Sequence, residues 1–521
     1  MCLSGFRFYG LTEKSYIFTH SKRSMDGLHR IIKSLTKAEK RYFKLFASSF
    51  KDDTKLVKLF DVMDALELED YTDEKATKKS GIAAITSYKT KLRKLVLKAM
   101  RNFHEESDDN ISLRNGISDI DFLIKKQLVS EAEKEHHKLK KYAEELQAYD
   151  ILSQLTVLNL QVTEKQKTTE KLKEFYDVLF QETDSYCNQI LEQNRATIFR
   201  SNVVRYANTF DYENPGLRIT IIRKFIEQAN SLLDFSKSMM AKVLLYDCLQ
   251  QCHSQLYEDV KTHEYEDEIY KLYAENPDLK RANWKIYFST TSNILTSKIY
   301  WDEYDSAYLI ITQLENDLIE ADDYLKNDLM LKFRMKYRLF HSKLAILQKC
   351  EQYTNVLDLE QELEYWLTQT EFNIPSAHLQ LSLLRFVSAL FYAQKLQVAK
   401  QWLNRFFMLD VVKQVKVIYY IFRIYEVIVL YDLGDLELSE QKANNLYKIL
   451  LDSKTDSQFI IHLRVFLLRL HKWDFTKPKD IEECQIWLVD FEKKRETEEE
   501  KTGNLFEFIR LGEWLKGKLS L

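Results

Sequence analysis

Glycine and proline are too scarce in this sequence to build a protein of β-sheets. The chain has 521 residues but only 10 glycines and 4 prolines, whereas average usage is about 7 and 5 per cent. Sheet proteins place turn signals about every 8 to 12 residues, and this chain cannot supply them. Long stretches instead carry apolar residues at helical spacing. The sequence therefore predicts an all-α protein, longer than one ordinary hydrophobic core.

Charge and cysteine content predict a cytoplasmic protein without a membrane partner. The 76 basic and 79 acidic residues give a net charge of −3, and the six cysteines are scattered, as is typical of a reducing compartment. The most apolar stretch, residues 415–433, contains Lys416, Arg423 and Glu426. Those charges are costly in lipid, so we interpret this stretch as a buried helix. Residues 1–24 lack the apolar core of a signal peptide.

Helix signals and changes in composition divide the chain into five parts. Residues 36–39, "TKAE", form a capping box that opens a helix, and a long helix is expected over 83–103. The predicted parts are an N-terminal extension (1–24, with Met25 as an alternative start), an N-terminal helical domain (25–104), a polar linker (105–116), helical repeats (117–470) and a C-terminal helical cap (471–521).

A large residue recurs three positions before a small one, as expected where two helices of a hairpin cross tightly. The pairs are Val129 and Ala132, Tyr304 and Ala307, Leu396 and Ala399, and Leu436 and Ser439, with a looser copy at Tyr353 and Val356. The large residues from Tyr304 onward are 49, 43 and 40 residues apart. This periodicity predicts further hinges near residues 173, 217 and 265.

This pattern resembles the tetratricopeptide repeat, in which two antiparallel helices cross with a bulky residue in the turn. The stretch 430–450 adds that family's Gly-Asp turn at Gly434 and Asp435. The intervals exceed the family's 34 residues, and Val427 stands where a small residue is usual. The resemblance implies a right-handed α-solenoid of antiparallel helix pairs over residues 117–470, and separate helical bundles are the alternative. It also implies a concave face that binds a protein or peptide.

The family's register places one side chain of each first helix on the concave face, about four residues before the large hinge residue. Tyrosines suit recognition because they offer a wide contact area with few torsions to immobilise. Packing between helices is the competing explanation for these aromatic rings. The predicted partner-binding positions are Tyr300, Gln348, Lys349, Tyr392, Tyr431 and Asp432.

The sequence indicates no enzyme, cofactor or metal. No glycines are clustered as in phosphate-binding loops, and the two "HE" dipeptides lack the second histidine of a zinc peptidase. The one cluster of note is "CLQQCH", which places Cys248 and Cys252 on one helical face beside His253. Further zinc ligands at the usual spacing are missing there, so we predict that these thiols pack in a core.

A run of basic residues supports a second hypothesis for function. Nine basic residues and no acid lie between Lys75 and Arg101, and Gly81 separates two predicted helices. The alternative is therefore a DNA-binding regulator with an N-terminal helix-turn-helix-like domain and a helical-repeat sensor domain. Seven acids in residues 61–74 offer neutralisation within the domain as the competing explanation. The candidate nucleic-acid contacts are Lys91, Lys94, Lys98 and Arg101.

Overall fold

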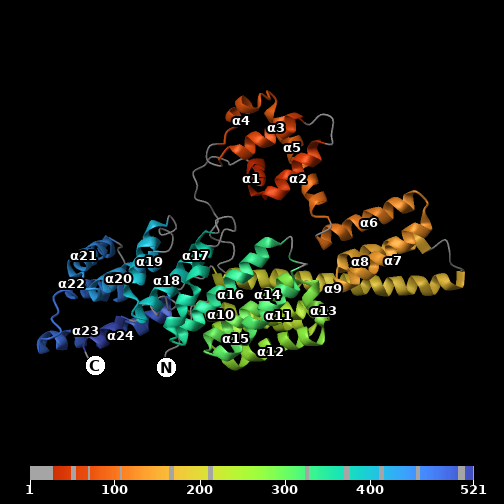
Figure 1. Cartoon of the computed structure of the whole chain (residues 1–521). Coiled ribbons are helices and arrows are strands. Elements are labelled where there is room, and N and C mark those ends of the chain that lie inside the picture. The colour runs from red at the N-terminus through yellow and green to blue at the C-terminus, as the bar shows by residue number, and fades with distance from the viewer. Residues whose placement is uncertain are drawn as a thin grey trace. The chain divides into compact units, whose positions relative to one another are not determined.

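Within the residues that it describes, the computed structural model contains helices and turns but no strand, which confirms the predicted all-α class (Figure 1). The predicted N-terminal extension and Met25 lie outside the described part. The described residues are 27–48, 54–67, 71–105, 108–163, 169–208, 215–322, 325, 328–368, 376–409, 416–452, 458–502 and 511–519.

The helices belong to two compact units, each described here by itself. One contains the described residues up to Ile190, and the other contains Leu191–Asp322 and the described residues from Leu329 onward. Helix α9 (Thr169–Asn208) is a continuous helix of 40 residues that contributes to both. The hinge predicted near residue 173 is therefore wrong, because no glycine or proline interrupts this helix.

The first five helices pack around one small core. They are α1 (Gly27–Ser34), α2 (Lys37–Ser48), α3 (Thr54–Ala65), α4 (Asp73–Ser80) and α5 (Ile85–Phe103). The predicted capping box is present: the Thr36 amide donates to Glu39 Oε2 at 2.7 Å, and the Glu39 amide donates to Thr36 Oγ1 at 3.3 Å. Phe43 and Phe60 stack in the core with ring centroids 4.4 Å apart. Local signals in the sequence thus account for where α2 begins and what it buries.

The predicted linker at 105–116 is mostly helical. Helix α6 (Asp109–Lys125) begins after Asp108, whose side chain accepts from the amides of the first turn. Gly116 does not mark a loop but a close approach of α6 to α7 (Val129–Glu145), because a Cβ there would lie 2.8 Å from Leu139 Cδ1. Helix α8 (Tyr149–Thr163) completes this group of three packed helices.

The second unit continues from the C-terminal part of α9. Its helices are α10 (Pro215–Asp234), α11 (Met239–Gln255), α12 (Asp259–Glu275), α13 (Pro277–Ala282), α14 (Trp284–Tyr300), α15 (Tyr304–Glu320), α16 (Leu329–Lys349), the 3₁₀ helix η3 (Tyr353–Leu359), α17 (Glu360–Thr368), α18 (Ser376–Tyr392), α19 (Leu396–Met408), α20 (Lys416–Asp432), α21 (Leu436–Asp452), α22 (Gln458–Arg469), α23 (Pro478–Thr502) and α24 (Leu511–Lys518).

One turn geometry joins two neighbouring helices at seven places in the described chain. In each turn a single residue has a left-handed backbone, with φ between 50° and 79°. The next residue's amide bonds back to a carbonyl five residues earlier, as from Glu303 to Lys298 at 2.9 Å, which is a Schellman motif. The left-handed residues are Gln127, Gln147, Tyr257, Asp302, Glu351, Gln394 and Gly434.

The large hinge residues read from the sequence each begin a helix, two positions after a left-handed residue. Val129, Tyr304, Tyr353, Leu396 and Leu436 are the first residues of α7, α15, η3, α19 and α21. The residues three positions later are all fully buried: Ala132, Ala307, Val356, Ala399 and Ser439. The hinge predicted near residue 265 is wrong, because that turn lies at Tyr257 and residue 265 is inside α12.

The first helices of successive pairs contact one another in order. Helix α11 packs on α14, α14 on α16, α16 on α18, and α18 on α20. At the C-terminal end, α24 buries Leu515 completely, and its Trp514 Nε1 donates to Asp432 Oδ2 of α20 at 2.8 Å. Residues 503–510 of the predicted C-terminal helical cap lie outside the described residues.

Candidate partner-binding face

The six predicted partner-binding residues occupy equivalent places in the structure. They lie at the C-terminal ends of α14, α16, α18 and α20, each of which is the first helix of a pair. Tyr300, Lys349, Tyr392 and Asp432 each stand two positions before a left-handed turn residue. The recurring turn therefore sets all four in the same position relative to their own hairpins.

Two of these side chains contact the turn of the preceding pair. The Tyr300 ring lies 6.5 Å from the ring of Tyr257 between centroids. The Lys349 ammonium lies 4.0 Å from the Asp302 carboxylate, and 18% of the Lys349 side chain is exposed. Tyr257 and Asp302 are themselves left-handed turn residues. These positions thus connect successive hairpins, and each keeps part of its surface open to solvent.

The remaining positions have other contacts. The Tyr392 ring lies 5.4 Å from that of Tyr353 at the start of η3, and Gln348 Oε1 accepts from Arg385 Nη1 at 2.7 Å. Tyr431 and Asp432 are covered by α24: Lys518 Nζ lies 2.7 Å from Asp432 Oδ1. That arrangement makes the last two positions a docking point for the C-terminal helix.

A row of hydrogen-bonded polar side chains, here named the polar seam, joins these helices about two to three turns before the predicted positions. Arg200 Nε of α9 donates to Asp247 Oδ2 of α11 at 2.6 Å. Asn293 Nδ2 of α14 donates to Asp247 Oδ1 at 2.9 Å, and Arg338 Nη2 of α16 donates to Asn293 Oδ1 at 3.3 Å. Burial disfavours the charge of Arg200, but the Asp247 carboxylate more than compensates and raises the pKa of the guanidinium.

The seam continues into α18 through histidine and serine. His341 Nδ1 of α16 lies 2.7 Å from Ser382 Oγ of α18. Burial, followed by the positive charges of Arg385 and Arg338, holds the pKa of His341 well below its usual range. Burial and Arg338 lower the pKa of His378 to about 4. Both imidazoles are therefore neutral at pH 7, and His341 contributes a hydrogen bond rather than a charge.

Sequence reasoning missed the polar seam. Its members in α9, α11, α14 and α16 are Arg200, Asp247, Asn293 and Arg338, at intervals of 47, 46 and 45 residues. Polar residues recurring at the repeat spacing were the available signal. The large and small residues of the turns do not reveal these positions, because the polar residues lie inside the helices.

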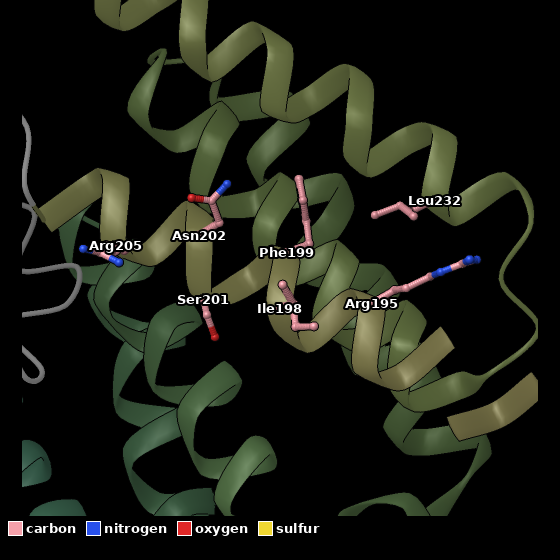
Figure 2. Close-up of a pocket in the computed structure, with 7 residues that line it drawn as sticks. All are labelled: Arg195, Ile198, Phe199, Ser201, Asn202, Arg205 and Leu232. Atoms are coloured by element: carbon pink, nitrogen blue, oxygen red, sulfur yellow. The ribbon is translucent and has the colours of Figure 1, made fainter. Parts of the chain in front are cut away.

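An open pocket of about 660 Å³ lies on α9 and α10. None of its lining residues is one of the predicted partner-binding positions. Figure 2 shows its seven lining side chains, six of them from α9 and Leu232 from α10. Ile198 is 72% exposed, and Arg195 and Arg205 stand at opposite ends of the α9 segment. The lining residues include no acid, histidine or cysteine, so this pocket offers no general acid or base.

The two cysteines of "CLQQCH" pack in an apolar cluster with Val203, Ile222 and Phe225. Burial raises the pKa of the Cys248 thiol well above its ordinary value, so the thiol stays protonated and unreactive. Within the described residues, no group of three or more His, Cys, Asp or Glu side chains is placed to hold a metal ion.

The candidate nucleic-acid contacts share the exposed face of α5. Lys91, Lys94, Lys98 and Arg101 are all exposed, whereas the opposite face of the helix buries Leu92, Val96 and Ala99. The predicted amphipathic division of this helix is therefore present.

Comparison with known proteins gives no relative: no family model, curated protein or solved structure matches this chain. Among the described helices, none is both long enough and apolar enough to cross a membrane.

Proposed function

We propose that residues 117–470 form a right-handed, tetratricopeptide-like solenoid that binds an extended protein or peptide segment and catalyses no reaction. The observation that carries this proposal is the recurrence of one Schellman turn in seven helix pairs. A repeated turn sets each second helix at the same angle to its first helix. Hairpins of one shape stack in a regular array, because each buries its apolar face against the next.

The order of helix contacts supports the array. First helices contact first helices from α11 to α20, and the polar seam joins four of them, α11, α14, α16 and α18. In a stacked array of this kind, the first helices line the inner surface, so Tyr300, Lys349 and Tyr392 are presented in a row. A segment lying along the row meets two aromatic rings and one ammonium group, which favours a partner with apolar and acidic side chains.

The two ends of this row have different contacts. Asp432 and Tyr431 already bind α24, so we propose that the partner occupies the stretch from Tyr300 to Tyr392 and stops before α20. This shortens the binding face predicted from the register by one repeat. The pocket on α9 and α10 lacks groups for acid–base catalysis, which supports a binding role.

The test is selection of binding peptides from a displayed random library on the full-length protein, followed by affinity measurement on variants. We expect the selected peptides to bind Tyr300→Ala/Lys349→Ala/Tyr392→Ala at least tenfold more weakly. Because Tyr300 and Tyr392 also contact neighbouring rings, the single variant Lys349→Glu is measured in parallel. It reverses one charge without removing a packed ring.

The matched control is Leu309→Ala/Ile319→Ala on α15, where the two side chains are 73% and 75% exposed. This second helix belongs to the outer layer in the proposed array, so the control should bind normally. Unchanged binding by both the triple variant and Lys349→Glu contradicts the proposal, and equal losses in the control contradict it as well. Far-UV circular dichroism confirms that each variant is folded.

A further inference from the structure

The N-terminal helices carry an exposed basic surface whose acidic neighbours are engaged elsewhere. Asp61 lies 2.7 Å from Lys44 Nζ, and Asp64 lies 2.8 Å from Lys40 Nζ. Both lysines belong to α2. The acids of residues 61–67 thus neutralise lysines of the preceding helices, and not the basic residues that follow them.

The same holds at the end of the acidic stretch. Glu67 pairs with Lys33 of α1 at 3.5 Å, and Asp73 pairs with Lys89 at 2.7 Å. Among the described ion pairs, Lys89 is the one basic residue of α5 that pairs with an acid of this stretch. Among the described ion pairs, the acids of this stretch therefore do not neutralise Lys91, Arg93, Lys94 or Arg101 of α5.

We name the remaining exposed cations the basic face. These cations have no described carboxylate within 4 Å, so their positive charge is exposed to solvent. They come from the last turn of α4 and from the exposed side of α5: Lys78, Lys79, Lys91, Arg93, Lys94 and Arg101. Lys98 lies on the same side of α5.

The backbone beneath the basic face is a helix-turn-helix. Helix α4 is eight residues long, and Gly81 ends it with φ 71°, a left-handed backbone that a side chain rarely adopts. Ala76 and Ile82 are buried where α4 crosses α3 and α5. Helix α5 then starts at Ile85 and runs for 19 residues, a length of about 28 Å.

The first exposed turn of α5 is polar and small rather than apolar. Thr86, Ser87 and Thr90 are exposed there, and the cations follow along the same side. A helix of this kind fits the major groove of B-DNA, with its N-terminal residues at base edges and its cations at phosphates. A helix that inserts into a membrane surface needs an apolar face beside its cations, and Leu97, at 40% exposure, is the one large apolar residue exposed on α5.

We propose that the basic face of α4 and α5 binds duplex DNA, with α5 in the major groove. This function is separate from peptide binding by the second unit, and either one can be disproved without the other. Phosphate contacts by Lys and Arg release counterions, so the affinity depends steeply on salt.

The experiment is a titration of full-length protein into a fluorescein-labelled DNA duplex of mixed sequence, followed by anisotropy over a salt series. The test variant replaces four members of the basic face on α5, Lys91, Arg93, Lys94 and Arg101, with Gln. We expect it to bind at least tenfold more weakly and to reduce the slope of log Kd against log salt by about 3 to 4, because each lost phosphate contact contributes roughly 0.9.

The matched control removes four charges from other helices of the same unit, Lys125, Lys126, Lys134 and Lys141 of the α6–α7 region, also by substitution with Gln. These lysines are exposed as well, so the control changes the net charge equally and should keep both affinity and slope. Vesicles containing an anionic lipid form a second arm, and we expect no binding to them at the salt concentration at which DNA binds.

Three results overturn the proposal. They are an absence of DNA binding by the unaltered protein at about 50 mM salt, equal losses in the test and control variants, and tighter binding to vesicles than to DNA. Circular dichroism on both variants separates loss of binding from loss of structure.

Discussion

Gly434 tests whether the recurring turn constrains the backbone as the structure indicates. It is the one glycine among the seven left-handed turn residues and has φ 79°. A Cβ added there meets nothing within 4 Å, so Gly434→Ala introduces no clash. The expected cost comes from the backbone alone.

The magnitude follows from two opposing terms. A non-glycine residue in the left-handed region costs roughly 1–2 kcal/mol. Alanine also lowers the conformational entropy of the unfolded chain, which stabilises the folded protein by about 0.4–1 kcal/mol. We therefore expect Gly434→Ala to lower the free energy of unfolding by about 1 kcal/mol. The reverse change, Gln394→Gly at the preceding turn, should raise it by up to about 1 kcal/mol for the same reason.

The assay is urea unfolding followed by tryptophan fluorescence. All seven tryptophans lie between Trp284 and Trp514, so this signal reports only on the second unit. Gly517→Ala in α24 is the matched control: it is the same substitution, in a helix and without a contact within 4 Å, and should be neutral or stabilising. If Gly434→Ala shifts the midpoint upward, as the control does, the left-handed turn is misassigned and the common hairpin geometry fails with it.

Three further predictions follow from the packing and the buried polar groups. Ala307 is fully buried at the crossing of α14 and α15, so Ala307→Leu should overpack it and cost about 1–3 kcal/mol in the same urea assay; an unaltered midpoint contradicts that crossing. Burial and neighbouring arginines depress the pKa values of His341 and His378 in the folded state. The unfolded chain therefore binds protons that the native state does not, and the free energy of unfolding should fall as the pH drops from about 6.5 towards 4. The double variant His341→Gln/His378→Gln should show a weaker pH dependence. An equally steep fall in this variant shows that the histidines do not cause it. Ellman's reagent should modify the exposed Cys187 in native protein but reach the buried Cys248 only after denaturation; rapid labelling of both thiols shows that the α11 core is open.

Much of the local structure could be predicted from the sequence because its causes are local. The scarcity of glycine and proline excludes sheets, Thr36 and Glu39 cap α2 within four residues, and the apolar period of α5 decides which of its sides is buried. The hinge pairs were also legible, since a tight crossing needs a small residue at one point of the second helix. Ala307 and Ala399 meet that need directly.

Where the hinge signal was absent, prediction by spacing failed. The turn at Tyr257 has the same backbone as the others, but Thr262 stands three positions after the helix start, where the legible pairs have Ala, Ser or Val. Uniform extrapolation placed the hinge near residue 265 instead. The linker predicted at 105–116 is a related case. The sequence shows Gly116 but does not show Leu139 beside it, and only packing distinguishes a turn glycine from a close approach of two helices.

By itself, the sequence determined the helical class, the positions of five turns and the amphipathic division of α5, because each depends on neighbours a few residues away. Only the tertiary structure decided which charges are neutralised and which polar residues meet. Asp61 and Asp64 pair with lysines about 20 residues earlier, while Arg200, Asp247, Asn293 and Arg338 meet across four helices. Ion pairs and hydrogen bonds act over a few ångströms of space, whatever the separation along the chain. The sequence therefore shows where a run of like charge lies, but only the fold decides how much of that charge is neutralised.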